Sequence, residues 1–253
     1  MTVPGENWVV EWTYSPADYF EEPREVSHED YNLIVKDGKA EARTSRDPRP
    51  ELCEQLGAKL EFRFQGVQLV SHKPYELSTP SVSCHHANGE RDLFVEVSNG
   101  IGISNHVDRT VTDANGTVVA DTQAERIQRK RFLGDLAVKH CPSDPLAREL
   151  LLHYGKAMND RDHFLVHLYD ITEALKRHFS GQQRARAELQ MTKAQWSELR
   201  KLANDPGLRQ GRHRACAEPS KFRNAAKHEW DTAMNIAAEI VEKYLKYLDD
   251  RRT

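Results

Sequence analysis

No apolar stretch of the sequence approaches the roughly 20 residues that a membrane-spanning helix needs. The first residues also lack the basic and then apolar pattern of a secretory signal peptide. The four cysteines are widely spaced and form no CxxC pair, which argues against a disulfide framework or a zinc ribbon. We therefore expect a cytoplasmic protein that has free thiols and no membrane contact.

The signatures of conventional metabolic enzymes are missing as well. The sequence contains no phosphate-binding loop, no GxSxG nucleophile elbow and no dinucleotide-binding fingerprint. It also shows no internal repeat and no low-complexity segment. We expect no cofactor and no resident metal ion, and we look for function in the distribution of charge.

Charge is distributed unevenly along the 253 residues. Residues 1–120 contain 11 Lys or Arg and 20 Asp or Glu, a net charge of −9. Residues 121–253 contain 25 and 19, a net charge of +6. The asymmetry indicates either an anionic partner for the second part or attraction between the two parts.

The first 120 residues have the pattern of an antiparallel β domain. Three Asp-Gly or Asn-Gly pairs, at residues 37–38, 88–89 and 115–116, lie between short β-prone runs and predict hairpin turns. An aromatic and β-branched strand is expected at residues 8–12, and one or two helical turns at residues 48–56. Residues 60–65 alternate between apolar and polar, so they predict a strand that resumes at residues 67–70 after a bulge at Gly66.

From Asp121 the spacing of apolar residues becomes helical. Capping residues, prolines and glycines predict five helices, at residues 121–140, 143–159, 161–179, 192–204 and 219–248. Short links and one apolar stripe on each helix are typical of a bundle. The sequence thus predicts an α+β protein with a β domain at residues 1–120 and a helical bundle at residues 121–253.

The strongest functional candidate is a basic stretch between the last two predicted helices. Residues 184–214 contain eight Lys or Arg and three Asp or Glu, and Arg209, Arg212, His213 and Arg214 lie within six residues beside Gly211. Crowded cations repel one another, so such a loop favours an anionic partner. Arginine binds phosphate and histidine can transfer a proton, although a solvated basic loop explains the same pattern. A second basic run, at residues 126–131, is either a solvated helix face or another wall of the same groove.

The second half of the chain resembles the HEPN superfamily, and more narrowly its Apea-like helical domains. The resemblance covers about residues 121–250 and rests on two segments, LYDITEAL at residues 168–175 and LAND at residues 202–205 leading to LRQGRH at residues 208–213. It implies a helical bundle and, for many members, metal-independent ribonuclease activity from an Arg and a His assembled across a dimer. The family motif has four to six residues between Arg and His, whereas Arg209 and His213 enclose three.

On this resemblance Arg209, Arg212 and His213 are the catalytic candidates, and Asp170 is expected to orient the arginine or the histidine from the facing helix. The residues expected to contact nucleic acid are Arg200, Arg209, Arg212 and Arg214.

Two further clusters contain potential metal ligands. His163, His167 and Asp170 fall on one face of the predicted third helix, where they form either a metal site or, as we expect, a polar seam beside the apolar stripe. The Cys84-His85-His86 sequence lies in a predicted hairpin with no second ligand pair nearby.

Two functions from different classes remain. In the first, the bundle is an RNA-binding effector or ribonuclease in a defence or toxin setting, and the β domain is a sensor or adaptor for a protein partner. In the second, the bundle is a non-catalytic, dimerising module of a larger bacterial assembly. Both include a homodimer, for which Trp230, Met234 and Val241 of the last helix are the expected interface.

Overall fold

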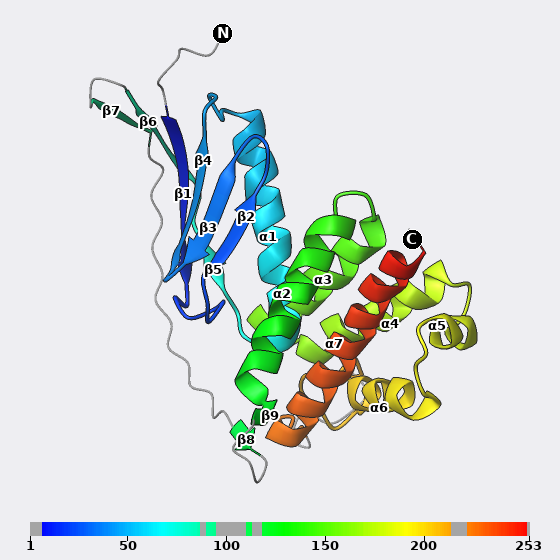
Figure 1. Cartoon of the computed structure of the whole chain (residues 1–253). Coiled ribbons are helices and arrows are strands. Elements are labelled where there is room, and N and C mark those ends of the chain that lie inside the picture. Colours follow the sequence, from blue (N-terminus) through cyan, green and yellow to red (C-terminus); the bar gives the residue numbers. More distant parts are fainter. Residues whose placement is uncertain (1–6, 87–89, 95–109, 113–117, 214–221, 252–253) are drawn as a thin grey trace. The chain divides into compact units, whose positions relative to one another are not determined.

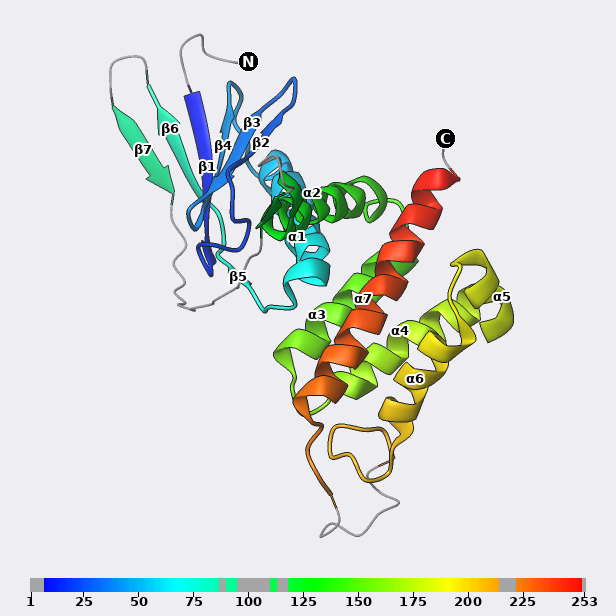
Figure 2. The ribbon, with the colours of Figure 1, turned by 60° about the horizontal axis from the view of Figure 1, so that its bottom comes forward.

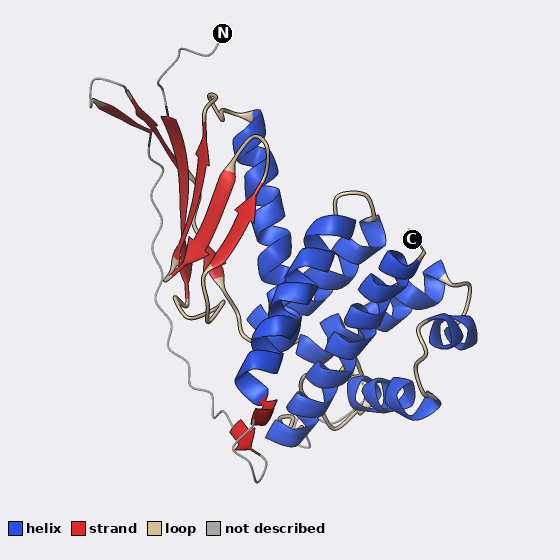
Figure 3. Ribbon diagram, in the orientation of Figure 1, coloured by secondary structure: helices blue, strands red, loops and turns tan. Residues whose placement is uncertain are grey.

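A computed structural model describes residues 7–86, 90–94, 110–112, 118–213 and 222–251. The protein belongs to the α+β class, because an antiparallel sheet is followed by a helical region (Figures 1 and 3). The chain divides into two compact units, of which the first comprises residues 1–61 and 75–129 and the second residues 62–74 and 130–253. The division falls inside helices α1 (Glu51–Ser71) and α2 (Thr122–His140), whereas the sequence placed one boundary after residue 120.

The sheet of the first unit has the strand order β2-β3-β4-β1-β6-β7, with β5 paired to the end of β1. Its strands are β1 (Asn7–Ser15), β2 (Arg24–Ser27), β3 (Asn32–Lys36), β4 (Lys39–Thr44), β5 (Glu76–Leu77), β6 (Ser81–His85) and β7 (Arg91–Phe94). A separate pair is formed by β8 (Thr110–Thr112) and β9 (Val118–Asp121). All of the described pairings are antiparallel, as the alternating sequence predicts.

The central strand β1 contributes every second side chain to the core. Trp8, Val10, Trp12 and Tyr14 are buried, which is the period of two expected when one face of a sheet is covered. The N-terminal turns of α1 lie over this face, since a Cβ built on Gly57 would be 4.0 Å from the Trp12 Nε1 atom. The aromatic residues of this strand therefore belong to the core of the first unit.

The predicted hairpin between β3 and β4 is confirmed. Its turn residues Asp37 and Gly38 have φ angles of 50° and 81°, the left-handed pair that a two-residue turn requires. The strands that flank the other two predicted turns also pair, as β6 with β7 and β8 with β9. The turn residues themselves, 88–89 and 115–116, lie outside the described residues.

The strands predicted at residues 60–65 and 67–70 are wrong, because both segments lie in α1. The local alternation between apolar and polar residues concealed a longer helical spacing. Buried Leu52, Leu56, Leu60, Phe64 and Val67 recur at steps of four or three residues and form one stripe. The helix predicted for residues 48–56 thus begins at Glu51 and continues to Ser71.

Gly66 marks a close helix-to-helix approach and not a β-bulge. A Cβ at this position would lie 2.8 Å from the Cα atom of Gly134 in α2, and it would also collide with the carbonyl oxygen of Leu133. Real Cβ atoms do not approach backbone this closely, so only glycine fits here. The two glycines let α1 and α2 pack backbone against backbone within the second unit.

The second unit is a helical bundle around one apolar core (Figure 2). Besides α2, it contains α3 (Pro145–Asn159), α4 (Phe164–His178), α5 (Gln182–Glu188), α6 (Lys193–Asn204) and α7 (Lys227–Asp250). The predicted starts at Asp144 and Thr192 are confirmed: the side chain of Asp144 accepts from Ala147 N at 2.7 Å, and Thr192 forms a capping box with Gln195. The short helix α5 was not predicted.

Two predicted helix starts are wrong. Helix α4 begins at Phe164 and not at residue 161, because residues 161–163 form a turn. Helix α7 begins at Lys227, because residues 222–226 use their backbone groups to bind the preceding loop. Pro219, where the sequence placed that start, lies outside the described residues.

Helix α7 carries the three apolar residues that were expected at a dimer interface, and they pack toward the inside of the bundle. Met234 and Val241 are buried, and the ring of Trp230 packs against Phe164 with a centroid distance of 4.1 Å. Met234 and Val241 are therefore not available for the expected dimer interface, whereas Trp230 is partly exposed and the homodimer stays a prediction.

Cys53, Cys84 and Cys141 are free thiols, whereas Cys216 lies outside the described residues. Within the described ranges, no helix has the length and the apolar character that crossing a membrane requires.

The tight packing of α1 on α2 predicts that Gly66→Ala lowers the free energy of unfolding by roughly 2–3 kcal/mol, as overpacking does in other proteins. Gly57→Ala, in the same helix, is the matched control. Because its Cβ would have space, we expect a neutral change or a gain of about 0.5–1 kcal/mol from helix propensity. Urea unfolding of both variants tests this, and equal stabilities would contradict the close approach at Gly66.

Candidate functional site

The basic loop, defined here as residues 208–213, follows α6 and is closed by a return segment, residues 222–226, that leads into α7 (Figure 2). Two backbone hydrogen bonds of 3.0 Å connect the return segment to the basic loop and to the residue that precedes the loop. The amide of Arg209 donates to the carbonyl of Arg223, whose own amide donates to the carbonyl of Gly207. The path of the loop is therefore fixed by its backbone and does not depend on its charged side chains.

Gln210 holds the loop to the return segment from inside. Its side chain is buried, its Nε2 donates to Asn224 Oδ1 at 3.2 Å, and its Oε1 accepts from Ala225 N at 3.0 Å. A buried amide needs both partners, because an unsatisfied one costs free energy. Gln210 thus has a structural role between the two arginines of the motif.

Gly211 lies against the C-terminal end of α6. A Cβ there would be 3.0 Å from the carbonyl oxygen of Asp205 and 3.2 Å from that of Ala203. The next amide, of Arg212, donates to the Ala203 carbonyl at 2.8 Å and occupies one of the acceptors that the helix end leaves open. The glycine in the motif therefore allows the loop to close on the helix.

An ion pair secures the far side of the return segment. The guanidinium of Arg223 donates to both carboxylate oxygens of Glu229, at 2.6 and 2.7 Å, and lies 3.6 Å from Asp205. Glu229 also accepts from the Ala226 amide at 2.8 Å, so it caps α7. The hydrogen bonds from Arg223 lower the pKa of Glu229 to about 2.

The cations predicted to contact nucleic acid or substrate lie on the outside of this framework. Arg209, Arg212 and His213 are exposed, and Arg214 lies outside the described residues. The guanidinium of Arg212 stacks on the ring of Tyr169 in α4, with its central carbon 4.0 Å from the ring centroid. The ring thereby gives one exposed arginine a fixed position.

The structure does not bring the remaining predicted residues to the loop. Asp170 lies 3.7 Å from His153 and, within the described part of the chain, forms no ion pair with a cation of the loop. The guanidinium of Arg200 donates to Gln182 at 2.9 Å, which joins α6 to α5. Among the described residues, Tyr169 and not Asp170 contacts an arginine of the loop, and the orienting role of Asp170 stays a prediction.

The second basic run, residues 126–131, also has cations that interact within the fold. Within the first unit, the Arg126 guanidinium forms a paired contact with the carboxylate of Glu21, with Nε to Oε1 at 3.0 Å and Nη2 to Oε2 at 2.5 Å. Lys130 is buried. At these two positions the cations are used inside the fold.

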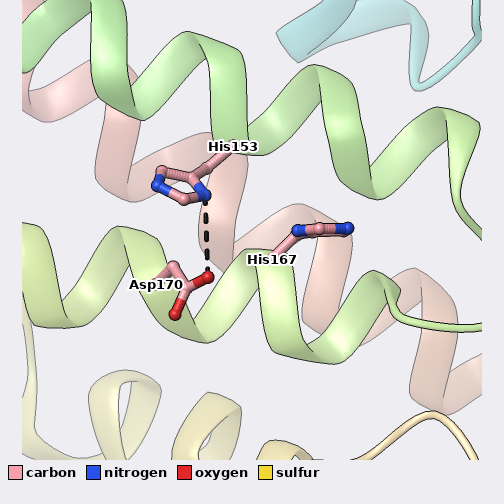
Figure 4. Close-up of side chains that lie close together, drawn as sticks. All are labelled: His153, His167 and Asp170. Atoms are coloured by element: carbon pink, nitrogen blue, oxygen red, sulfur yellow. Dashed lines mark ion pairs between the residues drawn. The ribbon is translucent and has the colours of Figure 1, made fainter.

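A cluster of two histidines and one aspartate lies between α3 and α4. One ligand atom from each of His153, His167 and Asp170 falls within 4.8 Å of the other two (Figure 4). The sequence predicted His163 as the third member. Its ring instead turns to Asp160, with Nδ1 at 3.0 Å from either carboxylate oxygen. Helix spacing placed His163 one turn from His167, but His163 is the residue before α4 begins.

Burial lowers the pKa of His153 from its ordinary value, against the opposite effect of the nearby Asp170 and Glu149 carboxylates. Burial thus favours the neutral form of the imidazole. The His153 Nδ1 atom is buried and has no hydrogen-bond partner. The polar seam that the sequence predicted leaves this nitrogen unsatisfied.

Among the described histidines of the first unit, His85 and His86 are not part of a cluster of three potential metal ligands. His86 pairs with Asp92 at 3.0 Å, and His85 lies 3.3 Å from the Ser83 hydroxyl, while Cys84 is buried. Three consecutive exposed or half-exposed residues, 28–30, also bring ligand atoms together. They belong to one turn, in which Asp30 already pairs with Arg46.

Comparison of the chain with protein-family models, with curated proteins and with solved structures finds no match. Function must therefore be argued from the side chains of the loop and of the histidine cluster.

The contact between Arg223 and Glu229 makes loop closure sensitive to acid. A carboxylate with a lowered pKa stabilises the fold above its unfolded value of about 4.3, and this contribution is lost as the pH falls toward 2. Glu229→Gln should flatten the dependence of stability on pH between these values, whereas Glu198→Gln, an exposed carboxylate on α6, should not. Thermal unfolding of the variants at pH 2–5 measures this. An NMR titration that places the Glu229 midpoint near 4.3 would contradict the contact.

Proposed function

We propose that the helical region binds RNA through the basic loop, as an RNA-binding effector of HEPN type. The observation that carries the proposal is the arrangement of the loop. Its backbone and its glutamine are held by hydrogen bonds, while Arg209, Arg212 and His213 are all exposed. If the fold needed these cations for its own stability, we would expect each to form an ion pair within the chain, as Arg223 does with Glu229.

Phosphate is the ligand that such a loop suits best. A guanidinium offers two parallel donors to a phosphate, and a rigid backbone lowers the entropy lost on binding. Stacking on Tyr169 also orients Arg212 for phosphate binding. The buried ring occupies one face of the guanidinium and leaves its edge for hydrogen bonds. RNA also offers bases that stack on planar side chains, and the exposed His213 ring is one of these.

The narrower form of the proposal is metal-independent RNA cleavage. His213 would accept the 2′-hydroxyl proton as the 2′ oxygen attacks phosphorus, and Arg209 with Arg212 would stabilise the charge of the phosphorane. The bond from phosphorus to the 5′ oxygen would then break, with the leaving oxygen protonated by water, to give a 2′,3′-cyclic phosphate and a 5′-hydroxyl end. This step rests on the resemblance to HEPN ribonucleases and on the presence of both residue types in one exposed loop. Asp170 is left out of this step, because it contacts no cation of the loop among the described residues. A homodimer, a cytoplasmic location and a defence or toxin setting belong to the same proposal.

The binding proposal predicts a steep dependence on salt. Arg209→Gln with Arg212→Gln should weaken binding of a single-stranded RNA and reduce the slope of log affinity against log salt by about 1.4, at roughly 0.7 for each lost phosphate contact. Arg43→Gln with Arg177→Gln removes the same charge from exposed positions that already pair with acids, and should change neither property much.

Fluorescence anisotropy at several salt concentrations measures both variants. Equal weakening in the two would show that net charge and not the loop binds RNA. Absence of binding at low salt would favour the alternative, in which the bundle is a non-catalytic interaction module.

The cleavage proposal predicts that His213→Ala lowers the rate of RNA cleavage by about 10²–10⁴-fold, the usual contribution of a general acid or base. His228→Ala, another exposed histidine, is the control and should keep full activity. Activity measured in EDTA should equal activity without it. Cleavage that survives in the His213 variant, or that requires a divalent ion, would contradict this mechanism.

A further inference from the structure

The histidine cluster between α3 and α4 has the ligand types of a transition-metal site. His153 projects from α3 toward Asp170 on α4, and His167 lies one turn before Asp170 on the same helix (Figure 4). Two imidazoles and one carboxylate are a common ligand set for zinc and related divalent ions. The cluster belongs entirely to the second unit.

The separation of the ligand atoms fits a single ion. His153 Nδ1 and Asp170 Oδ2 are 3.7 Å apart. Ligands at about 2.0–2.1 Å from a tetrahedral zinc ion lie roughly 3.4 Å from each other. All three ligand atoms fall within 4.8 Å of one another, so side-chain rotations of modest size would bring them to one ion.

Each of the two imidazole rings has a carboxylate near its Nε2 atom. His153 Nε2 lies 3.9 Å from Glu149, and His167 Nε2 lies 3.3 Å from Asp160. Metal-binding histidines usually donate their second ring N–H to a carboxylate, which fixes the tautomer and directs the other nitrogen to the ion. His167 Nε2 lies within hydrogen-bond distance of Asp160, which allows its Nδ1 to carry the free electron pair, whereas Glu149 is near His153 Nε2 without a hydrogen bond.

A simple His–Asp contact does not account for the arrangement. At 3.7 Å the His153–Asp170 pair is too long for a hydrogen bond, and the buried Nδ1 of His153 has no other partner. A buried polar atom needs a partner, and for a nitrogen beside two other potential ligands an ion or a water molecule would supply it.

We propose that His153, His167 and Asp170 bind one divalent transition-metal ion of the zinc class, with water completing its coordination. The Asp170 side chain is 40 % exposed, so the ion would remain open to solvent on one side. Such an ion would link α3 to α4 and stabilise the bundle, because it binds the folded state and not the unfolded chain. The site is independent of the proposed RNA binding, since the loop contributes no ligand.

The test is calorimetric titration of the EDTA-treated full chain with Zn²⁺. We expect one ion per chain and an increase in melting temperature on its addition. His153→Ala and His167→Ala should each weaken Zn²⁺ binding by about 100-fold or more, and Asp160→Asn by about 10-fold, the scale of a lost supporting carboxylate. His163→Ala is the matched control, because His163 contacts the same Asp160 but not the cluster, and it should bind Zn²⁺ as the unaltered chain does.

Asp170→Asn keeps the shape of the side chain and tests the site if a histidine variant fails to fold. Absorption spectra with Co²⁺ identify the ligands, because nitrogen and oxygen ligands give no thiolate charge-transfer band. No Zn²⁺ binding to the full chain would overturn the proposal. Undiminished binding in His153→Ala or in Asp170→Asn, or a thiolate band from the cysteines, would overturn it as well.

Discussion

Burial of one face of α4 is the constraint on which the helical region depends. Phe164, Leu168, Ile171 and Leu175 are buried at steps of four, three and four residues, and the helix packs against α3, α5, α6 and α7. A stripe of this kind fixes the rotation of the helix about its axis. The direction of every other α4 side chain follows from it, including Tyr169 beneath the basic loop and the pair His167 and Asp170 on the side of α3.

One helix thus contributes side chains to both of the proposed sites. On one side Tyr169 gives Arg212 a stacking surface, and on another His167 and Asp170 meet His153. The loop adds its own constraint, because Gln210 and Gly211 bind the backbone so that Arg209, Arg212 and His213 can stay in solvent. The contacts that hold the loop do not use the side chains of Arg209 or His213, so replacing these two residues should leave the loop closed.

Features encoded by neighbouring residues could be predicted from the sequence. The α+β class, the Asp37-Gly38 hairpin and the Thr192 capping box depend on a few adjacent side chains. Strands were wrongly predicted within α1 because residues 60–65 alternate between apolar and polar. The helical stripe of buried residues becomes visible only over the sixteen residues 52–67. His153 and Tyr169 were missed as site residues for a different reason. Each meets its partner through the packing of separate segments, and no local pattern records that relation.

We propose that α4 and the loop together form an RNA-binding surface. The most direct measurement is an NMR titration of the full chain with a short single-stranded RNA at low salt, following backbone amides and arginine Nε–H groups. We expect the signals of Arg209, Arg212, His213 and Tyr169 to shift together, whereas those of Arg223, held by Glu229, stay unchanged. Shifts confined to other parts of the chain, or no shifts at all, would contradict it.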